Sequence, residues 1–259
     1  MIFAINVGNT HVVFGCVDKN GSVEQMLKLP TDLRETAIGY AARIKQSLEL
    51  VDADIDSIDG AILSSVVPPL TETVKEAISL LFHKKPLVVG AGIKTGLHIL
   101  IDDPGSIASD LVAMAVAAKE NYSLPCVVLD MGTATTLVCI NEAGKYIGGA
   151  IMPGVHISME ALYRTASLLP RFELKKPKKI IASATADSMC SGIIYGTAGA
   201  IDGILDRFSD ELGKAPASIV CTGGVAKVLA PFCRYQWVED EKLLLQGLGM
   251  IYEKNAISE

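Results

Sequence analysis

Two short turns in this sequence carry residue types that suit phosphate binding, and they follow the same pattern. Near the N-terminus the apolar stretch FAINV leads into Gly8, Asn9 and Thr10, and a second apolar run follows. Much later CVVLDM leads into GTATT and again into a Val- and Thr-rich run. Glycine lets the backbone approach an anion closely, and N–H groups and hydroxyls bind phosphate oxygens. Each turn therefore predicts a phosphate-binding hairpin.

The residue just before each turn differs between the two copies. Asp130 ends the apolar strand of the second copy, whereas Asn6 holds the matching place in the first. A carboxylate there can hold a cation that offsets phosphate charge. Asparagine has nearly the same shape but no negative charge, so the first copy lacks one electrostatic contributor. A third element, the pair Gly223–Gly224 after the strand-like run SIVCT, resembles a glycine pair on which a nucleoside can lie.

The elements that position these turns alternate between strands and helices. Turn signals after both second strands predict hairpins. Apolar residues at helical spacing predict helices over residues 36–50, 71–82, 106–122, 187–213 and 243–255. Thr71 is the expected N-cap of the second helix. The duplicated pattern predicts an α/β protein of two domains, residues 1–115 and 116–259, that face each other across a cleft.

Composition argues against several classes of protein. Half of the residues are hydrophobic, aromatics make up only 5%, and the formal net charge is −6. The basic run KKPKK is short and reads as a solvated loop, so we expect no nucleic-acid partner. The N-terminus lacks a signal-peptide pattern, and no apolar run suits a membrane span, which predicts a cytoplasmic protein without a membrane partner. The six cysteines form no CxxC pair and are expected to be buried thiols.

The chain resembles the type III pantothenate kinases, within the acetate kinase, sugar kinase and actin-like superfamily. The matching stretches occur in family order and include VGNTHVVFG, SSVVPPLT, DMGTATT, GGAIMPG, SGIIYG, TGG and LQGL. The resemblance implies two duplicated actin-like (ribonuclease H-like) domains around a nucleotide cleft. It also implies a homodimeric transferase that uses ATP to phosphorylate the 4′-hydroxyl of pantothenate, the first step of coenzyme A biosynthesis. Its expected cofactors are Mg²⁺ and a monovalent cation, K⁺ or NH₄⁺.

Carried onto this chain, the resemblance assigns a role to each matching residue. Asp110 matches the general base, and Asp130 matches the ligand of the monovalent cation. The positions that match ATP contacts are Asn6, Gly8, Asn9, Thr10, Thr133, Gly223 and Gly224. The positions that match the pantothenate site are Ile101, Ala108, Ser109, Asp110, Leu111 and Thr185.

Several of these positions depart from the family pattern. The family has Asp where this chain has Asn6, and Tyr where it has Ile101. It has Gly-Ala-Asp-Arg followed by Asn, where this chain has Ala-Ser-Asp-Leu over residues 108–111 and then Met114. Gly-Lys-Asn-Thr has become Ala-Ser-Ala-Thr at residues 182–185. The glycine turns are retained, whereas polar groups of the expected substrate pocket are replaced by apolar or small residues.

These departures leave three interpretations open. The first is a pantothenate kinase that tolerates the changes. The second is a paralogue that binds nucleotide or a partner but has lost phosphoryl transfer. The third is a kinase for a less anionic or more apolar acceptor, because Asp110 is kept while Arg and Tyr are lost. Asp110 also has a purely structural alternative, as a residue that caps the Ala-rich helix after it.

Overall fold

The computed structural model describes residues 1–166 and 168–256, and the chain packs as two compact units. Unit 1 contains Met1–Asn121 together with the chain from Lys242 onward, and unit 2 contains Tyr122–Glu241. These packing units differ from the expected halves 1–115 and 116–259, because the last helix packs with the first unit. The division at residue 115 therefore stays a prediction.

The sheet of unit 1 is built around its first strand. Its strands are β1 (Ile2–Val7), β2 (His11–Val17), β3 (Val23–Pro30), β4 (Gly60–Ser65) and β5 (Leu87–Val88). They lie in the order β3-β2-β1-β4-β5, with β1 antiparallel to β2 and parallel to β4. The short strand β6 (His98–Ile99) follows β5 in the chain. Every residue of β1 is buried, as the mostly apolar sequence IFAINV predicts for a central strand, and the burial includes Asn6.

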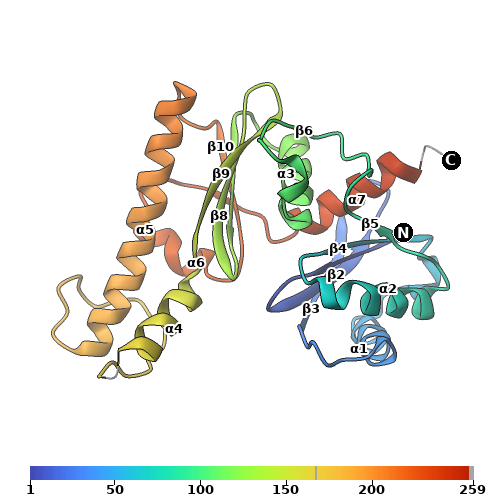
Figure 1. The fold of residues 1–259 in the computed structure, drawn as a ribbon, viewed down its shortest axis with the longest axis horizontal. Helices are drawn as coiled ribbons and strands as arrows, with labels where there is room; N and C mark the ends of the chain where they lie inside the picture. Colours follow the sequence, from blue (N-terminus) through green and yellow to red (C-terminus); the bar gives the residue numbers. More distant parts are fainter. Residues whose placement is uncertain (167, 257–259) are drawn as a thin grey trace. The chain divides into compact units, whose positions relative to one another are not determined.

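Helices cover both faces of this sheet. They are α1 (Ala37–Glu49), α2 (Pro68–Phe82), α3 (Ser109–Asn121) and α7 (Leu243–Ala256), with short 3₁₀ helices η1 (Ile55–Ser57) and η2 (Pro104–Ser106). Figure 1 shows α1 and α2 side by side on one face, where they bury Phe3, Phe14 and Tyr40. α3 and α7 pack against each other, and α7 contacts β1, β2 and β4. Gly247 of α7 has its Cα against the main chain of Ala113, so this close contact requires glycine.

Unit 2 repeats the plan of unit 1. Its strands are β7 (Cys126–Met131), β8 (Ala134–Ile140), β9 (Lys145–Pro153), β10 (Ser218–Thr222) and β11 (Val238–Glu239). Within this unit they lie in the order β11-β10-β7-β8-β9, with β7 antiparallel to β8 and parallel to β10. β7, β8 and β10 thus correspond to β1, β2 and β4, which confirms the duplicated α/β plan.

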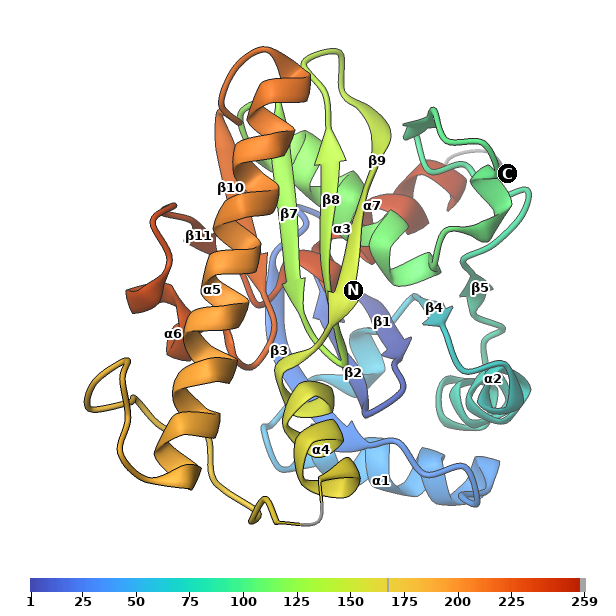
Figure 2. The ribbon, with the colours of Figure 1, turned by 60° about the vertical axis from the view of Figure 1, so that its left-hand side comes forward.

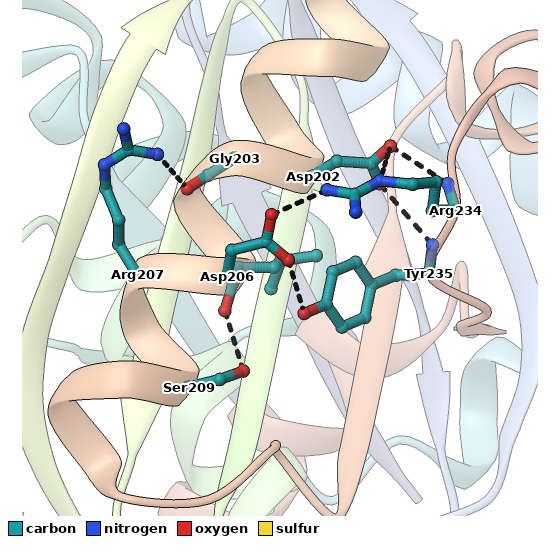
Figure 3. A network of polar contacts seen from close by, with 8 residues as sticks. Asp202, Gly203, Asp206, Arg207, Ser209, Arg234 and Tyr235 are labelled. Atoms are coloured by element: carbon teal, nitrogen blue, oxygen red, sulfur yellow. Dashed lines mark hydrogen bonds and ion pairs between the residues drawn. The ribbon is translucent and has the colours of Figure 1, made fainter.

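The helices of unit 2 are α4 (Val155–Thr165), α5 (Thr185–Leu212) and α6 (Ala226–Leu229), followed by the 3₁₀ helix η3 (Ala230–Phe232). Figure 2 shows α5 running along one face of the sheet, where it buries residues such as Ile194 and Ile201. Two acids of α5, Asp202 and Asp206, bind the segment after η3 through Arg234 and Tyr235 (Figure 3).

Most predicted elements are confirmed, but one helix start is wrong. α2 begins at Pro68 rather than near Thr71, and its N-cap position is Val67. Proline suits the first turn of a helix, because the N–H groups of that turn make no hydrogen bond within the helix and the one that proline lacks is not needed. Thr71 instead donates a hydrogen bond to Ser65 Oγ at 2.9 Å.

The expected burial of the cysteines is confirmed: all six are free, buried thiols. Within residues 1–166 and 168–256, no helix has the length and apolar character needed to cross a membrane.

Candidate active site

The first glycine turn joins β1 to β2 and is fixed by main-chain contacts. Gly8 donates its N–H to the carbonyl of His11 at 3.0 Å, and Thr31 at the end of β3 donates its hydroxyl to the Gly8 carbonyl at 2.7 Å. A side chain at Gly8 would stand only 3.0 Å from the His11 carbonyl oxygen. Asn9 and Thr10 are exposed. The turn is therefore rigid at its glycine and presents its polar residues to solvent.

Asn6 lies immediately before this turn, with a buried side chain. It is 5% exposed, and its Oδ1 atom has no hydrogen-bond partner among the described residues. In the register of β1 and β4, Asn6 stands beside Ser64, which is fully buried. Buried polar atoms almost always have a partner, so this amide oxygen is a candidate acceptor for a bound ligand at the strand end.

Asp110 lies in the first turn of α3, close to that strand end. The preceding residue, Ser109, has its Oγ 2.8 Å from Ser64 Oγ and donates to the Ser65 carbonyl at 3.3 Å. Asp110 Oδ1 accepts the N–H of Leu111 at 2.8 Å. Burial raises the pKa of Asp110, and this main-chain hydrogen bond only partly offsets the effect. We call Asn6, Gly8, Ser64, Ser109 and Asp110 the unit 1 cluster.

The positions that depart from the family pattern fall into two groups in unit 1. Ile101, Ala108 and Leu111 are all partly exposed, in the segment before α3 and in its first turn. Met114, by contrast, is 3% exposed and lies in the buried stretch of α3. The loss of asparagine at that position therefore concerns the interior of unit 1, whereas the loss of arginine at Leu111 affects an accessible surface.

Asp130 ends β7 in unit 2, with hydroxyl residues on both neighbouring strands. In the sheet register Asp130 stands opposite Thr136 of β8 and beside Thr222 of β10. Alternation along the strands places these three side chains on the face away from the helix-packed core. Thr136 Oγ1 is buried and has no hydrogen-bond partner among the described residues. A carboxylate beside hydroxyl oxygens is a donor set suited to a hard cation.

Close main-chain packing supports the second turn, which contains Gly132 and Thr133. Gly223 has φ +105°, and a Cβ on it would collide with the main chain of Met131. A Cβ on Gly154 would collide with the carbonyl oxygen of Thr133. Gly223 is thus brought against the turn that follows Asp130, while Gly224 is exposed. Asp130, Thr133 and the glycine pair are therefore neighbours in unit 2.

Thr185, the expected pantothenate contact of unit 2, belongs to a different element from the turn after Asp130 and the glycine pair. It is the first residue of α5 and is exposed, with Ala184 at the N-cap position. Within the described residues, no group of three or more His, Cys, Asp or Glu side chains is arranged to hold a metal ion.

Sequence reasoning missed Ser64, Thr136 and Thr222. Ser64 and Thr222 each come near the carboxyl end of an apolar strand, which is the same signal that pointed to Asn6 and Asp130. Thr136 becomes a neighbour of Asp130 only through the register of β7 and β8. Ser64 and Thr222 could therefore have been found from the sequence, whereas Thr136 could not.

Comparison with known proteins decides the family. Residues 2–207 match the family model described as type III pantothenate kinase. The chain belongs to the type III pantothenate kinase family. Consistent with this membership, it is 42% identical over 257 residues to a type III pantothenate kinase of Bacillus cytotoxicus, covering 99% of this chain and 97% of that protein. The chain is a kinase of this family, and use of ATP follows from that class.

Solved structures show the same fold at low sequence identity. A putative Baf family transcriptional activator of Campylobacter jejuni is 18% identical, with a TM-score of 0.61, and 98% of this chain and 99% of that one are covered. Component A of the (R)-2-hydroxyglutaryl-CoA dehydratase of Acidaminococcus fermentans is 14% identical, with a TM-score of 0.58, and 99% and 100% of the chains are covered. These likenesses concern the fold alone and agree with the actin-like architecture expected from the sequence.

Proposed function

We propose that this chain transfers the γ-phosphoryl group of ATP to the 4′-hydroxyl of pantothenate, with Asp110 as the general base. The observation that carries the proposal is the half-buried setting of Asp110 in the first turn of α3, where the preceding Ser109 contacts Ser64 of β4. Burial raises the pKa of Asp110, and a carboxylate with a raised pKa is a stronger base than an ordinary one. Asp110 would accept the hydroxyl proton as the alcohol oxygen attacks the γ-phosphorus and ADP leaves.

The two glycine turns would bind phosphate oxygens. Gly8 with Asn9 and Thr10 in unit 1, and Thr133 in unit 2, offer main-chain N–H groups and hydroxyls. Gly223 and Gly224 would accommodate the nucleoside. Phosphoryl transfer depends chiefly on positioning the reactants and neutralising charge, so such contacts account for much of the catalysis.

The cations expected from the family fit the oxygen donors of this chain. Asp130 with the unpaired hydroxyl of Thr136 would hold a monovalent cation, and the unpaired Oδ1 of Asn6 would be a neutral ligand for Mg²⁺. When bound, these cations supply positive charge that offsets the charge of the phosphates. Losing the carboxylate at position 6 is expected to lower the rate roughly a hundredfold, because one electrostatic contributor of about 3 kcal/mol is absent.

The residues at the expected acceptor pocket favour an alternative substrate. Leu111 has no hydrogen-bond donor on its side chain and is only partly buried, so it cannot bind an anionic group as arginine would. Ile101, in the loop before α3, likewise has an apolar and partly exposed side chain. A less anionic acceptor than pantothenate is the second candidate function, and this pair of apolar residues favours it.

A homodimer forms part of the proposal. The Ala-rich helix α3 does not require one, because its apolar residues are buried against α7 of the same unit. Support comes from the family and from exposed apolar side chains on unit 2, where Ile151, Ile157 and Ile181 are 77%, 44% and 83% exposed. Light scattering at the concentration of the kinase assay is expected to give twice the chain mass, and a monomer would contradict the dimer.

The enzymatic proposal is tested by measuring ADP release with and without pantothenate. The unaltered protein is compared with a version carrying Asn6→Asp and Leu111→Arg, which restores the two family residues. We expect slow pantothenate-dependent release from the unaltered protein and faster release from the restored one. Release from the restored version alone would instead identify a paralogue that has lost transfer. Release only with a less anionic alcohol would favour the second candidate function.

A further inference from the structure

The start of α3 is attached to the sheet of unit 1 by a hydroxyl pair. Ser109 Oγ lies 2.8 Å from Ser64 Oγ and 3.3 Å from the Ser65 carbonyl oxygen, to which it donates. Either hydroxyl can be the donor in this pair, because each carries one proton and two acceptor lone pairs. Ser64 is fully buried and Ser109 is partly exposed, so this hydrogen bond is partly shielded from water.

The same strand end connects to β1 and to α2. Ser64 and Ser65 stand beside Asn6 and Val7 in the parallel register of β1 and β4. Ser65 Oγ accepts from Thr71 Oγ1 at 2.9 Å, which links the strand to the first turns of α2. The hydroxyl of Ser109 thus connects α3 to the part of the sheet from which the first glycine turn starts.

Asp110 directly follows Ser109, so the position of its carboxylate depends on how the first turn of α3 is held. The Oδ1 of Asp110 accepts the N–H of the next residue, Leu111, a local contact that does not tie the helix end to the sheet. The Ser109 hydroxyl provides the long-range anchor that this local contact lacks.

We propose that Ser109, acting through Ser64, is a positioning residue that holds Asp110 at the correct place for proton abstraction. The inference rests on the proposed role of Asp110 as the base. Ser109 need not touch the substrate in this role. Displacement of a reacting group by about 1 Å can cost up to roughly a hundredfold in rate, so a modest loosening of this helix end is enough to lower turnover.

The test compares Ser109→Ala with Ser109→Thr, which keeps a hydroxyl at the same position. Ser79→Ala is the matched control, because Ser79 donates to the Lys75 carbonyl at 2.9 Å within α2, away from the unit 1 cluster. We expect Ser109→Ala to lower kcat about tenfold while the KM for ATP stays unchanged, and Ser109→Thr to restore most of it. Equal kcat in Ser109→Ala and the unaltered protein would overturn the proposal, as would equal losses in Ser109→Ala and Ser79→Ala.

Hydrogen exchange separates this inference from the proposed function. We expect faster amide exchange in residues 108–114 of Ser109→Ala, with unchanged exchange in α2 and α7. This measurement needs no turnover, so it decides the positioning role even if pantothenate is not phosphorylated by the unaltered protein. Unchanged exchange at the start of α3 would overturn the inference, whereas absent turnover with increased exchange would overturn only the proposed function.

Discussion

Replacing Asp202 by alanine is expected to destabilise unit 2 substantially. Asp202 is 6% exposed, and its two carboxylate oxygens each accept the N–H of Arg234 at 3.0 Å (Figure 3). Its Oδ1 also lies 3.4 Å from the N–H of Tyr235. These contacts join α5 to the segment that follows the glycine pair and η3. Asp202→Ala would leave partly buried main-chain donors without a partner.

The expected loss is about 3 kcal/mol, because hydrogen bonds to a charged acceptor contribute roughly 1.5–3 kcal/mol and each unpaired donor adds a desolvation cost. Asp206, one helical turn further along α5, provides the matched control. It binds the exposed guanidinium of Arg234 at 2.6 Å and the hydroxyl of Tyr235 at 2.9 Å, and its side chain is 44% exposed. An exposed ion pair contributes little, so Asp206→Ala should be much closer to the unaltered protein.

Urea unfolding followed by tryptophan fluorescence measures this difference. Trp237 is the single tryptophan of the chain and packs against the core of unit 2, so it reports on that unit. With a urea m-value of about 2 kcal/mol/M, Asp202→Ala should lower the midpoint by about 1.5 M. An Asp202→Ala midpoint within about 0.3 M of the unaltered protein would refute the reasoning. So would an equal loss in Asp206→Ala, because the buried main-chain contacts would then contribute nothing extra.

Three further outcomes follow from the packing and charge of single residues. Gly247→Ala should lower stability by about 2 kcal/mol in thermal melts, because the new methyl group would collide with the main chain of Ala113. Gly192→Ala on α5 is the control and should be neutral or stabilising, because its methyl group would meet open space. Equal melting temperatures for the two variants would contradict this expectation. Gly223→Ala should unfold or strongly destabilise unit 2 in the tryptophan assay, since φ is +105° and the new Cβ would meet main-chain atoms, and a parent-like midpoint would contradict this. Asp110→Asn should raise stability at pH 8, because burial raises the pKa of Asp110 in the folded state and so penalises its charged form. That gain should disappear as the pH falls below the ordinary carboxyl range, and a gain that persists in acid would contradict its electrostatic origin.

The helices and hairpins could be predicted from the sequence where local signals agree. Helix α1 has apolar residues at helical spacing, and its N-cap residue Thr36 accepts the N–H of Gly39. The sequence favours Thr71 as the N-cap of α2, but the N-cap is Val67, because the proline pair that follows Val67 suits the first turn of a helix. Local propensity thus finds the element but not always its first residue.

Contacts between distant segments could not be predicted in the same way. The packing of α7 with unit 1 depends on Gly247 meeting Ala113, two positions that only the folded chain brings together. Likewise Asn6 and Asp130 were found because a polar residue ends an apolar strand, whereas Ser109 binds Ser64 through a hydroxyl that no sequence pattern marks. Strand register and side-chain geometry supply this information.

The most direct test of the central claim is the formation of 4′-phosphopantothenate in a single turnover, with the unaltered protein and with Asp110→Asn. Phosphorus NMR of the quenched reaction identifies the product. We predict that the unaltered protein forms it and that Asp110→Asn, with nucleotide affinity retained, is slower by about a hundredfold or more, because the general base is lost. Equal rates for both proteins, or no product from the unaltered protein while ATP is bound, would contradict the account.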